Sequence, residues 1–167
     1  PHPHLWSPSA GVCNLSKPIN VFLEDSEMMT KAYKSASDLG SRINIDLLPA
    51  KPNFQSENIS TSLRLKFQKL PDTSSYHLTI TSDVVELISG DECGFFYGLV
   101  TLIQLDQMYH KLIPCGSIVD KPRFSWRGQH LDTARHFYSV NSLLKLLDLM
   151  SLFKLNKFHW HGTDDEA

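Results

Sequence analysis

The sequence has no marked excess of charge of either sign and no long apolar run. Its 167 residues include 16 Lys and Arg and 18 Asp and Glu, which gives a net charge of −2. Proteins that bind nucleic acid or an anionic membrane electrostatically carry a clear basic excess, which this sequence lacks. No apolar stretch approaches the ~20 residues that a membrane-spanning helix needs. We therefore expect partners that are neither nucleic acid nor membrane.

Cysteine is scarce, and no signal peptide is evident. The three cysteines, Cys13, Cys93 and Cys115, are far apart and form none of the CxxC or Cys/His spacings that bind metal. Their odd number favours buried or free thiols in a reducing compartment; one disulfide plus a free thiol in a secreted protein is the alternative. The first residues, PHPHLWSPSAG, contain neither a basic nor an apolar leader region. A cytoplasmic or periplasmic location is therefore favoured over secretion.

The length of the chain allows one ordinary domain, or a small domain and part of another. Hydrophobic residues make up 41% and charged residues 20%, the usual proportions of a globular protein. The sequence Asp120-Lys121-Pro122 indicates a boundary, because the residue before a proline is driven into an extended conformation. The sequence therefore predicts an N-terminal segment (1–17), an α+β domain (18–119) and a final segment (120–167).

The α+β domain is predicted to contain a mostly antiparallel sheet with helices on one face. Apolar runs and alternating patterns predict strands at 19–23, 43–48, 63–67, 76–81, 84–89 and 112–118. Ser82 and Asp83 separate two of these strands, so we expect a hairpin there. Nothing in this domain resembles catalytic machinery. We expect it to support the final segment, with sugar binding as the alternative.

Two helices are predicted in the same domain. Ser26 is a suitable N-cap for a helix to about Leu39, and Gly40 stands where a glycine would follow the helix in the left-handed conformation. Apolar residues at helical spacing predict a second helix over residues 93–108. Residues 51–60 are rich in Pro, Asn and Ser and are predicted to form a loop.

The final segment reads as strand, helix and strand. The strands are predicted at 126–132 and 156–161, and Ser139 can cap a helix whose apolar residues recur on one face. A unit of this length favours two parallel strands with a right-handed crossover. Their carboxyl ends then lie on one rim, which is where active sites form in βα barrels. Asp132 and Arg135 should therefore face the same cleft as His161 and Asp164.

Four interpretations of these polar residues remain open on the residues alone. His159 and His161 point to one strand face and could bind a metal, but two ligands are too few. Asp164, Asp165 and Glu166 could supply a carboxylate pair for glycoside hydrolysis, although neighbouring residues do not flank one bond well. Arg135 could hold ligand hydroxyls while Asp164 orients a catalytic acid elsewhere. Finally, the residues could form a buried ion pair that joins the two loops.

The segment DKPRFSWRGQHLDTARHFYSVNSLLKLLDLMSLFKLNKFHWHGTDDE closely resembles the start of the catalytic barrel of glycoside hydrolase family 20, the β-N-acetylhexosaminidases. The family pattern is roughly D-x-P-R-F-x-x-R-G-x-x-L-D-x-x-R-H, a helix, and K-x-N-x-x-H-W-H-x-x-D-D. The preceding GFFYGLVTLIQL is similar to the last helix before that barrel, and the α+β domain matches the family's non-catalytic domain. Gly162 is a departure, since the family usually has a branched apolar residue there.

This resemblance implies the start of a (β/α)8 barrel and removal of terminal β-linked N-acetylglucosamine or N-acetylgalactosamine with retention. The substrate's own acetamido oxygen acts as the nucleophile, and no metal or cofactor is implied. Arg135 matches the arginine that binds the sugar's hydroxyls. Asp164 matches an aspartate that supports the catalytic acid, and His161 lies in the same motif.

The family's catalytic Asp-Glu pair is expected beyond Ala167, so the 167 residues alone are predicted to be inactive. The alternative function is a non-catalytic carbohydrate-binding or interaction module. Two strands and a helix would also leave apolar surface exposed. We therefore expect association with another chain, or ordering of this segment by packing on the α+β domain.

Overall fold

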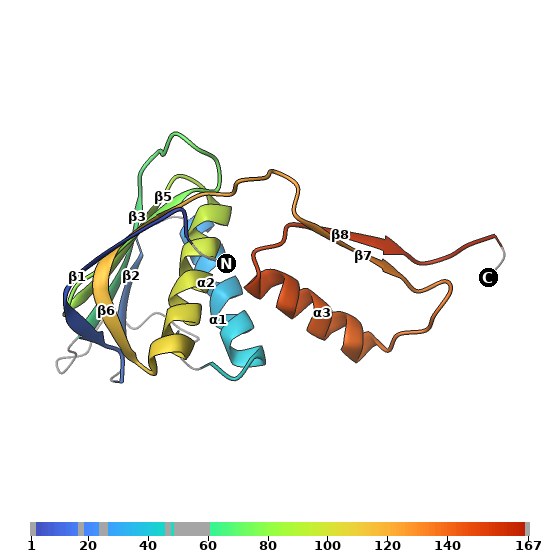
Figure 1. The fold of residues 1–167 in the computed structure, drawn as a ribbon, viewed down its shortest axis with the longest axis horizontal. Helices are drawn as coiled ribbons and strands as arrows, with labels where there is room; N and C mark the ends of the chain where they lie inside the picture. Colours follow the sequence, from blue (N-terminus) through green and yellow to red (C-terminus); the bar gives the residue numbers. More distant parts are fainter. Residues whose placement is uncertain (1–2, 17–18, 24–26, 46–47, 49–60, 166–167) are drawn as a thin grey trace. The chain divides into compact units, whose positions relative to one another are not determined.

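The chain forms two compact units, Pro1–Pro122 and Arg123–Ala167. The computed structural model describes residues 3–16, 19–23, 27–45, 48 and 61–165 (Figure 1). The predicted N-cap Ser26 and the predicted loop over residues 51–60 lie outside these described residues. None of the helices formed by the described residues is long and apolar enough to cross a membrane.

A six-stranded sheet in the order β1-β6-β4-β5-β3-β2 forms the first unit. Its strands are β1 (Leu5–Asn14), β2 (Ile19–Leu23), β3 (Thr61–Phe67), β4 (Tyr76–Ile80), β5 (Val84–Ser89) and β6 (Leu112–Asp120). Pairing is antiparallel between β1, β6, β4 and β5, and parallel between β5, β3 and β2. The predicted β4–β5 hairpin and the mostly antiparallel sheet are therefore confirmed.

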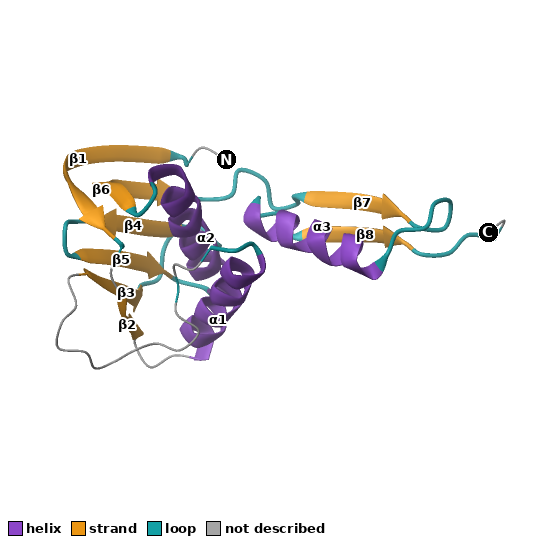
Figure 2. Ribbon diagram, turned by 90° about the horizontal axis from the view of Figure 1, so that it is seen from below, coloured by secondary structure: helices purple, strands orange, loops and turns teal. Residues whose placement is uncertain are grey.

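Helices α1 (Glu27–Arg42) and α2 (Glu92–Tyr109) lie on one face of this sheet (Figure 2). Asp91 caps α2, because its side chain accepts a hydrogen bond of 2.8 Å from the Gly94 amide. Apolar side chains from both layers are almost wholly buried between them: Met29, Leu39, Leu63, Leu78, Leu87, Phe95, Leu99 and Ile103. This core follows from the period-2 and helical patterns of the sequence.

Glycines at two successive turns of α2 bring that helix close to the sheet. A Cβ at Gly94 would lie 2.4 Å from the carbonyl oxygen of Ser75, and one at Gly98 would lie 2.3 Å from a methyl group of Leu87. Both distances are shorter than real contacts, and the first is to backbone that moves little. The close approach of α2 to β4 and β5 therefore depends on the absence of side chains at these positions.

The prediction that residues 1–17 form a separate segment is wrong for Leu5–Asn14. These residues form β1, an edge strand that pairs along β6. The strand was hard to recognise because the register shifts between Pro8 and Val12, at a bulge where Gly11 adopts a φ of 108°. A bulge interrupts the alternation of side chains on which strand prediction depends.

The predicted strand at Ile43–Leu48 is also wrong in its described part, and Gly40 does not end α1. The helix continues to Arg42, and the left-handed residue is Asn44, with a φ of 59°. Gly40 instead allows a close backbone approach, because a Cβ there would lie 2.8 Å from the carbonyl oxygen of Ile45. Ile45 and Leu48 are buried but form no strand. Their burial accounts for the apolar pattern from which the strand was predicted.

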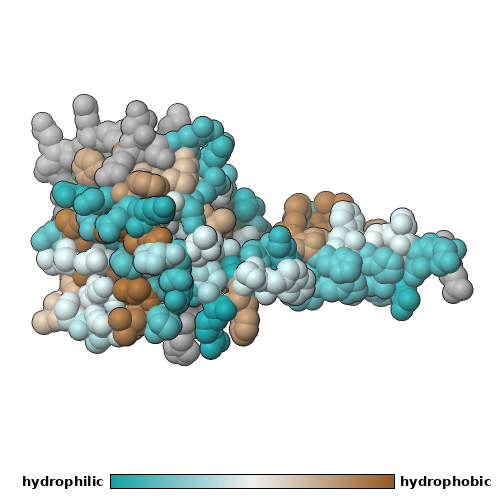
Figure 3. Space-filling model, turned by 90° about the horizontal axis from the view of Figure 1, so that it is seen from above, coloured by the Kyte–Doolittle hydropathy of each residue, from teal (hydrophilic) through white to brown (hydrophobic). Residues whose placement is uncertain are grey.

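The second unit consists of β7 (Gly128–Asp132), α3 (Val140–Leu152) and β8 (Lys157–His161). The two strands are parallel, as predicted, and the Ser139 hydroxyl caps α3 by accepting a hydrogen bond from the Ser142 amide. Met150 is the one buried hydrophobic residue among those described in this unit. Figure 3 shows hydrophobic residues on the surface of this unit. The exposed large apolar side chains there include Phe124, Trp126, Phe137, Val140, Leu144, Leu149 and Phe153.

Substitution of Gly94 by Ala is expected to destabilise the first unit by roughly 1–3 kcal/mol, since the added methyl group overpacks the contact of α2 with Ser75, just before β4, and Ser89 of β5. Urea unfolding monitored by circular dichroism measures this change. Gln107→Ala, on the exposed side of the same helix, is the control and should leave the free energy of unfolding nearly unchanged. Equal stability of the Gly94→Ala protein and the original would contradict the close approach.

Candidate active site

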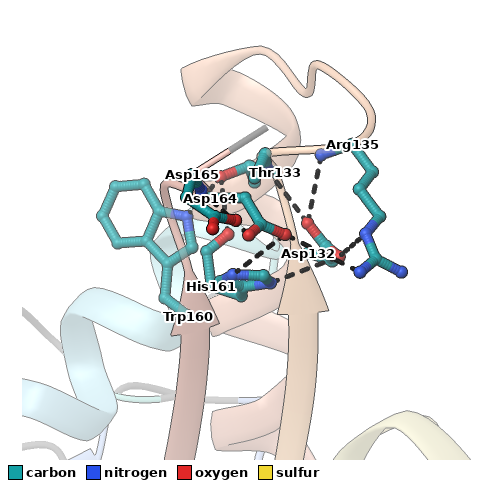
Figure 4. Close-up of polar contacts among 8 residues, drawn as sticks. Asp132, Thr133, Arg135, Trp160, His161, Asp164 and Asp165 are labelled. Atoms are coloured by element: carbon teal, nitrogen blue, oxygen red, sulfur yellow. Dashed lines mark hydrogen bonds and ion pairs between the residues drawn. The ribbon is translucent and has the colours of Figure 1, made fainter. Parts of the chain in front are cut away.

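The carboxyl ends of β7 and β8 meet at one rim of the second unit. Asp132 and His161 are the last residues of the two strands and are direct partners in the parallel register. Arg135 follows β7 in a short loop, and Asp164 follows β8. The structure therefore brings together the four residues that the sequence predicted to share a cleft (Figure 4).

Asp132 organises the loop that follows β7. Its Oδ1 accepts hydrogen bonds from the backbone amides of Ala134 at 3.0 Å and Arg135 at 3.1 Å. An aspartate that bonds to amides two and three residues ahead holds the backbone in a tight turn. These amides, the Arg135 amide first, favour the ionised form and lower the pKa of Asp132, with the nearby His161 acting in the same direction.

His161 lies between two carboxylates, one from each strand end. Its Nδ1 is 3.3 Å from Oδ2 of Asp132, and its Nε2 is 3.9 Å from Oδ2 of Asp164. Asp164 is further fixed by the turn that follows, because its Oδ1 accepts a hydrogen bond of 2.9 Å from the Asp165 amide. The imidazole thus links the residue predicted to support a catalytic acid to the loop that carries Arg135.

The Arg135 guanidinium stands next to both carboxylates but remains open to solvent. Its Nε is 3.5 Å from Oδ2 of Asp132, and one terminal nitrogen is 3.6 Å from Oδ2 of Asp164. The side chain is 77% exposed, so this is not the buried ion pair that was one of the open interpretations. A guanidinium oriented by carboxylates and still exposed can direct several N–H groups to a polar ligand.

The structure does not bring His159 into this group. Its ring packs edge-on against His130, with the ring centroids 4.7 Å apart, two register pairs before Asp132 and His161. Within the described ranges, no group of three or more His, Cys, Asp or Glu side chains is arranged to hold a metal ion. Glu166, part of the carboxylate-pair interpretation, lies outside the described residues.

Two rim residues received no role from the sequence. Asp132 was placed in the cleft, yet its control of the loop was not recognised; the spacing Asp-x-x-Arg after a strand is the signal that could have shown it. Thr133 lies on the other side of the same rim, where its hydroxyl accepts a hydrogen bond of 2.8 Å from Nε1 of Trp160. Close packing does not require Gly162, because a Cβ there would meet the indole nitrogen at 4.0 Å, an ordinary contact distance.

Known proteins match the chain over almost its whole length. The model of glycosyl hydrolase family 20, domain 2, matches residues 1–121, and that of the family's catalytic domain matches residues 124–167. A β-hexosaminidase of Akkermansia muciniphila is 42% identical over 71% of the chain, and one of Vibrio vulnificus is 30% identical over 89%. The chain spans 25% and 19% of these two relatives, respectively.

Solved structures give the same result. The exo-β-N-acetylglucosaminidase of Vibrio harveyi, solved in complex with N-acetylglucosamine, matches the whole chain with a TM-score of 0.83 and 29% identity, over 26% of its own length. The β-N-acetylhexosaminidase of Bacteroides fragilis matches 96% of the chain with a TM-score of 0.78 and 25% identity, over 32% of its own length.

An α+β domain is followed by a parallel βαβ unit with polar residues at its strand ends, which is where barrel enzymes build their active sites. The matched models are specific for one group of such enzymes. The chain belongs to glycosyl hydrolase family 20.

The turn after β7 should loosen only in acid. Because the pKa of Asp132 is lowered, the contribution of its carboxylate is complete above the ordinary aspartate pKa of about 3.9 and is lost as the pH falls through the lower folded value. The amide proton shifts of Ala134 and Arg135, followed by NMR from about pH 6 to about pH 2, should move together only below about pH 4.

Asp132→Asn is the control for this titration, since an amide oxygen can still accept both hydrogen bonds but does not titrate. The two amide shifts should then stay constant over the same range. A midpoint above about pH 4 in the unsubstituted chain would contradict the proposed origin of the pKa shift.

Proposed function

We propose that the chain is the N-terminal part of a retaining β-N-acetylhexosaminidase, an enzyme that removes terminal β-linked N-acetylglucosamine or N-acetylgalactosamine. The observation that carries this proposal is the exposed Arg135 guanidinium, held between Asp132 and Asp164 at the rim of the family's catalytic domain. Relatives named β-hexosaminidase and a structure solved with N-acetylglucosamine support the same substrate class.

Arg135 binds the terminal sugar in this proposal. Its planar group can donate paired hydrogen bonds to neighbouring ring hydroxyls, which a lysine would not match geometrically. Asp132 fixes the backbone amide of Arg135 and stands beside its Nε, so the side chain is oriented before the sugar arrives. Binding then requires little further ordering, which favours affinity.

Asp164 and His161 support the catalytic acid rather than reacting themselves. In substrate-assisted hydrolysis, a glutamic acid protonates the leaving oxygen while the substrate's acetamido oxygen attacks the anomeric carbon; water later opens that intermediate with retention. A negative charge held near that glutamic acid raises its pKa, which suits a proton donor. Asp164, fixed by the Asp165 amide and linked to His161, is suited to this role.

The 167-residue chain by itself should not hydrolyse a chromogenic β-N-acetylglucosaminide, because the catalytic Asp-Glu pair is expected in later barrel strands. The full-length protein should hydrolyse it under the same conditions. Turnover by the short chain would show that the acid is among these residues. Binding of chitin fragments by a full-length protein that hydrolyses nothing would instead favour the non-catalytic carbohydrate-binding module.

In the full-length enzyme, Arg135→Ala should lower kcat/KM, because charge-assisted hydrogen bonds to the sugar are lost. The lower kcat/KM should correspond to a loss of about 2–4 kcal/mol of transition-state stabilisation. Arg135→Lys should recover only part of this loss, since lysine keeps the charge but not the fork. Lys145→Ala removes an exposed positive charge from α3 and is the matched control. An unchanged kcat/KM in Arg135→Ala would refute the sugar-binding role.

A further inference from the structure

A hydrogen bond between side chains joins the carboxyl ends of β7 and β8 on the side away from the carboxylates. Nε1 of Trp160 donates to Oγ1 of Thr133 at 2.8 Å, across the boundary between the two strands. Figure 4 shows the indole nitrogen turned toward Thr133, while His161 points to Asp132. The sugar-binding and acid-supporting roles proposed above do not use this contact.

The two sides of the rim are separated by the alternation of side chains along a strand. Asp132 and His161 are paired in the register and share one face, whereas the preceding pair, Leu131 and Trp160, lies on the other. Thr133 follows Asp132 directly and reaches the Trp160 side. The hydrogen bond between Trp160 and Thr133 can therefore affect the side that carries Asp132 and His161 only through the backbone. Neither of these two side chains needs to touch the ligand.

Thr133 makes two further contacts with the end of β8. Its amide donates a hydrogen bond of 2.9 Å to the His161 carbonyl, and its hydroxyl lies 3.2 Å from the same oxygen. These contacts continue the strand pairing one residue beyond the last register pair, Asp132 and His161. The hydroxyl can thus donate its one hydrogen to the His161 carbonyl while one of its lone pairs accepts from the Trp160 indole.

The spacing held by Thr133 determines the distances on the opposite face. Asp132 and Arg135 flank Thr133 in the same turn, and His161 supplies the carbonyl to which Thr133 is bonded. A shift of Thr133 relative to β8 would therefore change the 3.3 Å contact between Asp132 and His161, and with it the 3.6 Å contact between Arg135 and Asp164. Both contacts belong to the site proposed to bind the sugar.

We propose that Thr133 and Trp160 are a positioning pair that holds the two halves of the sugar-binding rim at their working separation. This inference rests on the proposed function, and it assigns neither residue a direct contact with substrate. Because Arg135 holds the sugar before the reaction begins, loss of the pair should weaken substrate binding more than it slows the chemical step.

The test is a double-mutant cycle in the full-length enzyme. Thr133→Val keeps the branched shape and removes the hydroxyl, and Trp160→Phe keeps an aromatic ring beside Phe158 and removes the indole N–H. Each single variant should raise KM for a chromogenic β-N-acetylglucosaminide by about fivefold, the usual effect of one neutral hydrogen bond, with a smaller change in kcat. The double variant should be little worse than either single one.

Thr133→Ser keeps the hydroxyl that Thr133→Val removes, so its KM should lie close to that of the unsubstituted enzyme. Trp126→Phe removes an indole N–H elsewhere in the same unit, and Thr79→Val removes an exposed hydroxyl from β4; both are controls expected to leave KM unchanged. Thermal unfolding of every variant identifies any general loss of folding.

The outcomes separate the two proposals. Hydrolysis by the unsubstituted enzyme together with unchanged KM in both single variants would overturn the positioning role and leave the proposed function intact. Multiplicative effects in the double variant would also overturn it, since the two residues would then act separately. Failure of Thr133→Ser to recover KM would overturn it as well, since the effect would then not come from the hydroxyl. An unsubstituted full-length protein without hydrolysis would instead refute the proposed function.

Discussion

The carboxylate of Asp132 is the contact on which the rim of this chain depends. One oxygen holds the turn after β7 through two backbone amides, and the other faces both the Arg135 guanidinium and the His161 imidazole. The same side chain therefore determines the backbone path and the local charge. Without it, an exposed arginine on a short loop would sample many orientations, and ordering it on ligand binding would cost free energy.

The first unit contains most of the buried core, and the second unit carries the polar residues of the candidate site. The first unit has a closed core between its sheet and two helices, with α2 held close to β4 and β5 by glycines. The second unit contributes the polar rim but buries little apolar surface of its own. A barrel of this kind is completed by eight strands and helices in about 250 residues, which accords with a chain that spans about a quarter of its relatives.

Sequence patterns predicted well the features that repeat and less well those that occur once. Period-2 and helical spacing located β3, β4, β5, α2 and α3, and the rule for parallel strands brought Arg135 and Asp164 to one rim. β1 was not predicted because the bulge near Gly11 interrupts its alternating pattern. A strand was wrongly predicted at 43–48 because Ile45 and Leu48 are apolar and buried. The roles of Asp132 and Thr133 were missed because they depend on backbone amides and carbonyls, which a sequence pattern does not display.

A crystal structure of the full-length protein with N-acetylglucosamine would test the central claim most directly. The account predicts the sugar at the carboxyl ends of β7 and β8, with guanidinium nitrogens of Arg135 about 3 Å from its ring hydroxyls and Asp132 still bonded to the Ala134 and Arg135 amides. A sugar bound away from this rim, or an Arg135 side chain turned away from a sugar bound at it, would contradict the account.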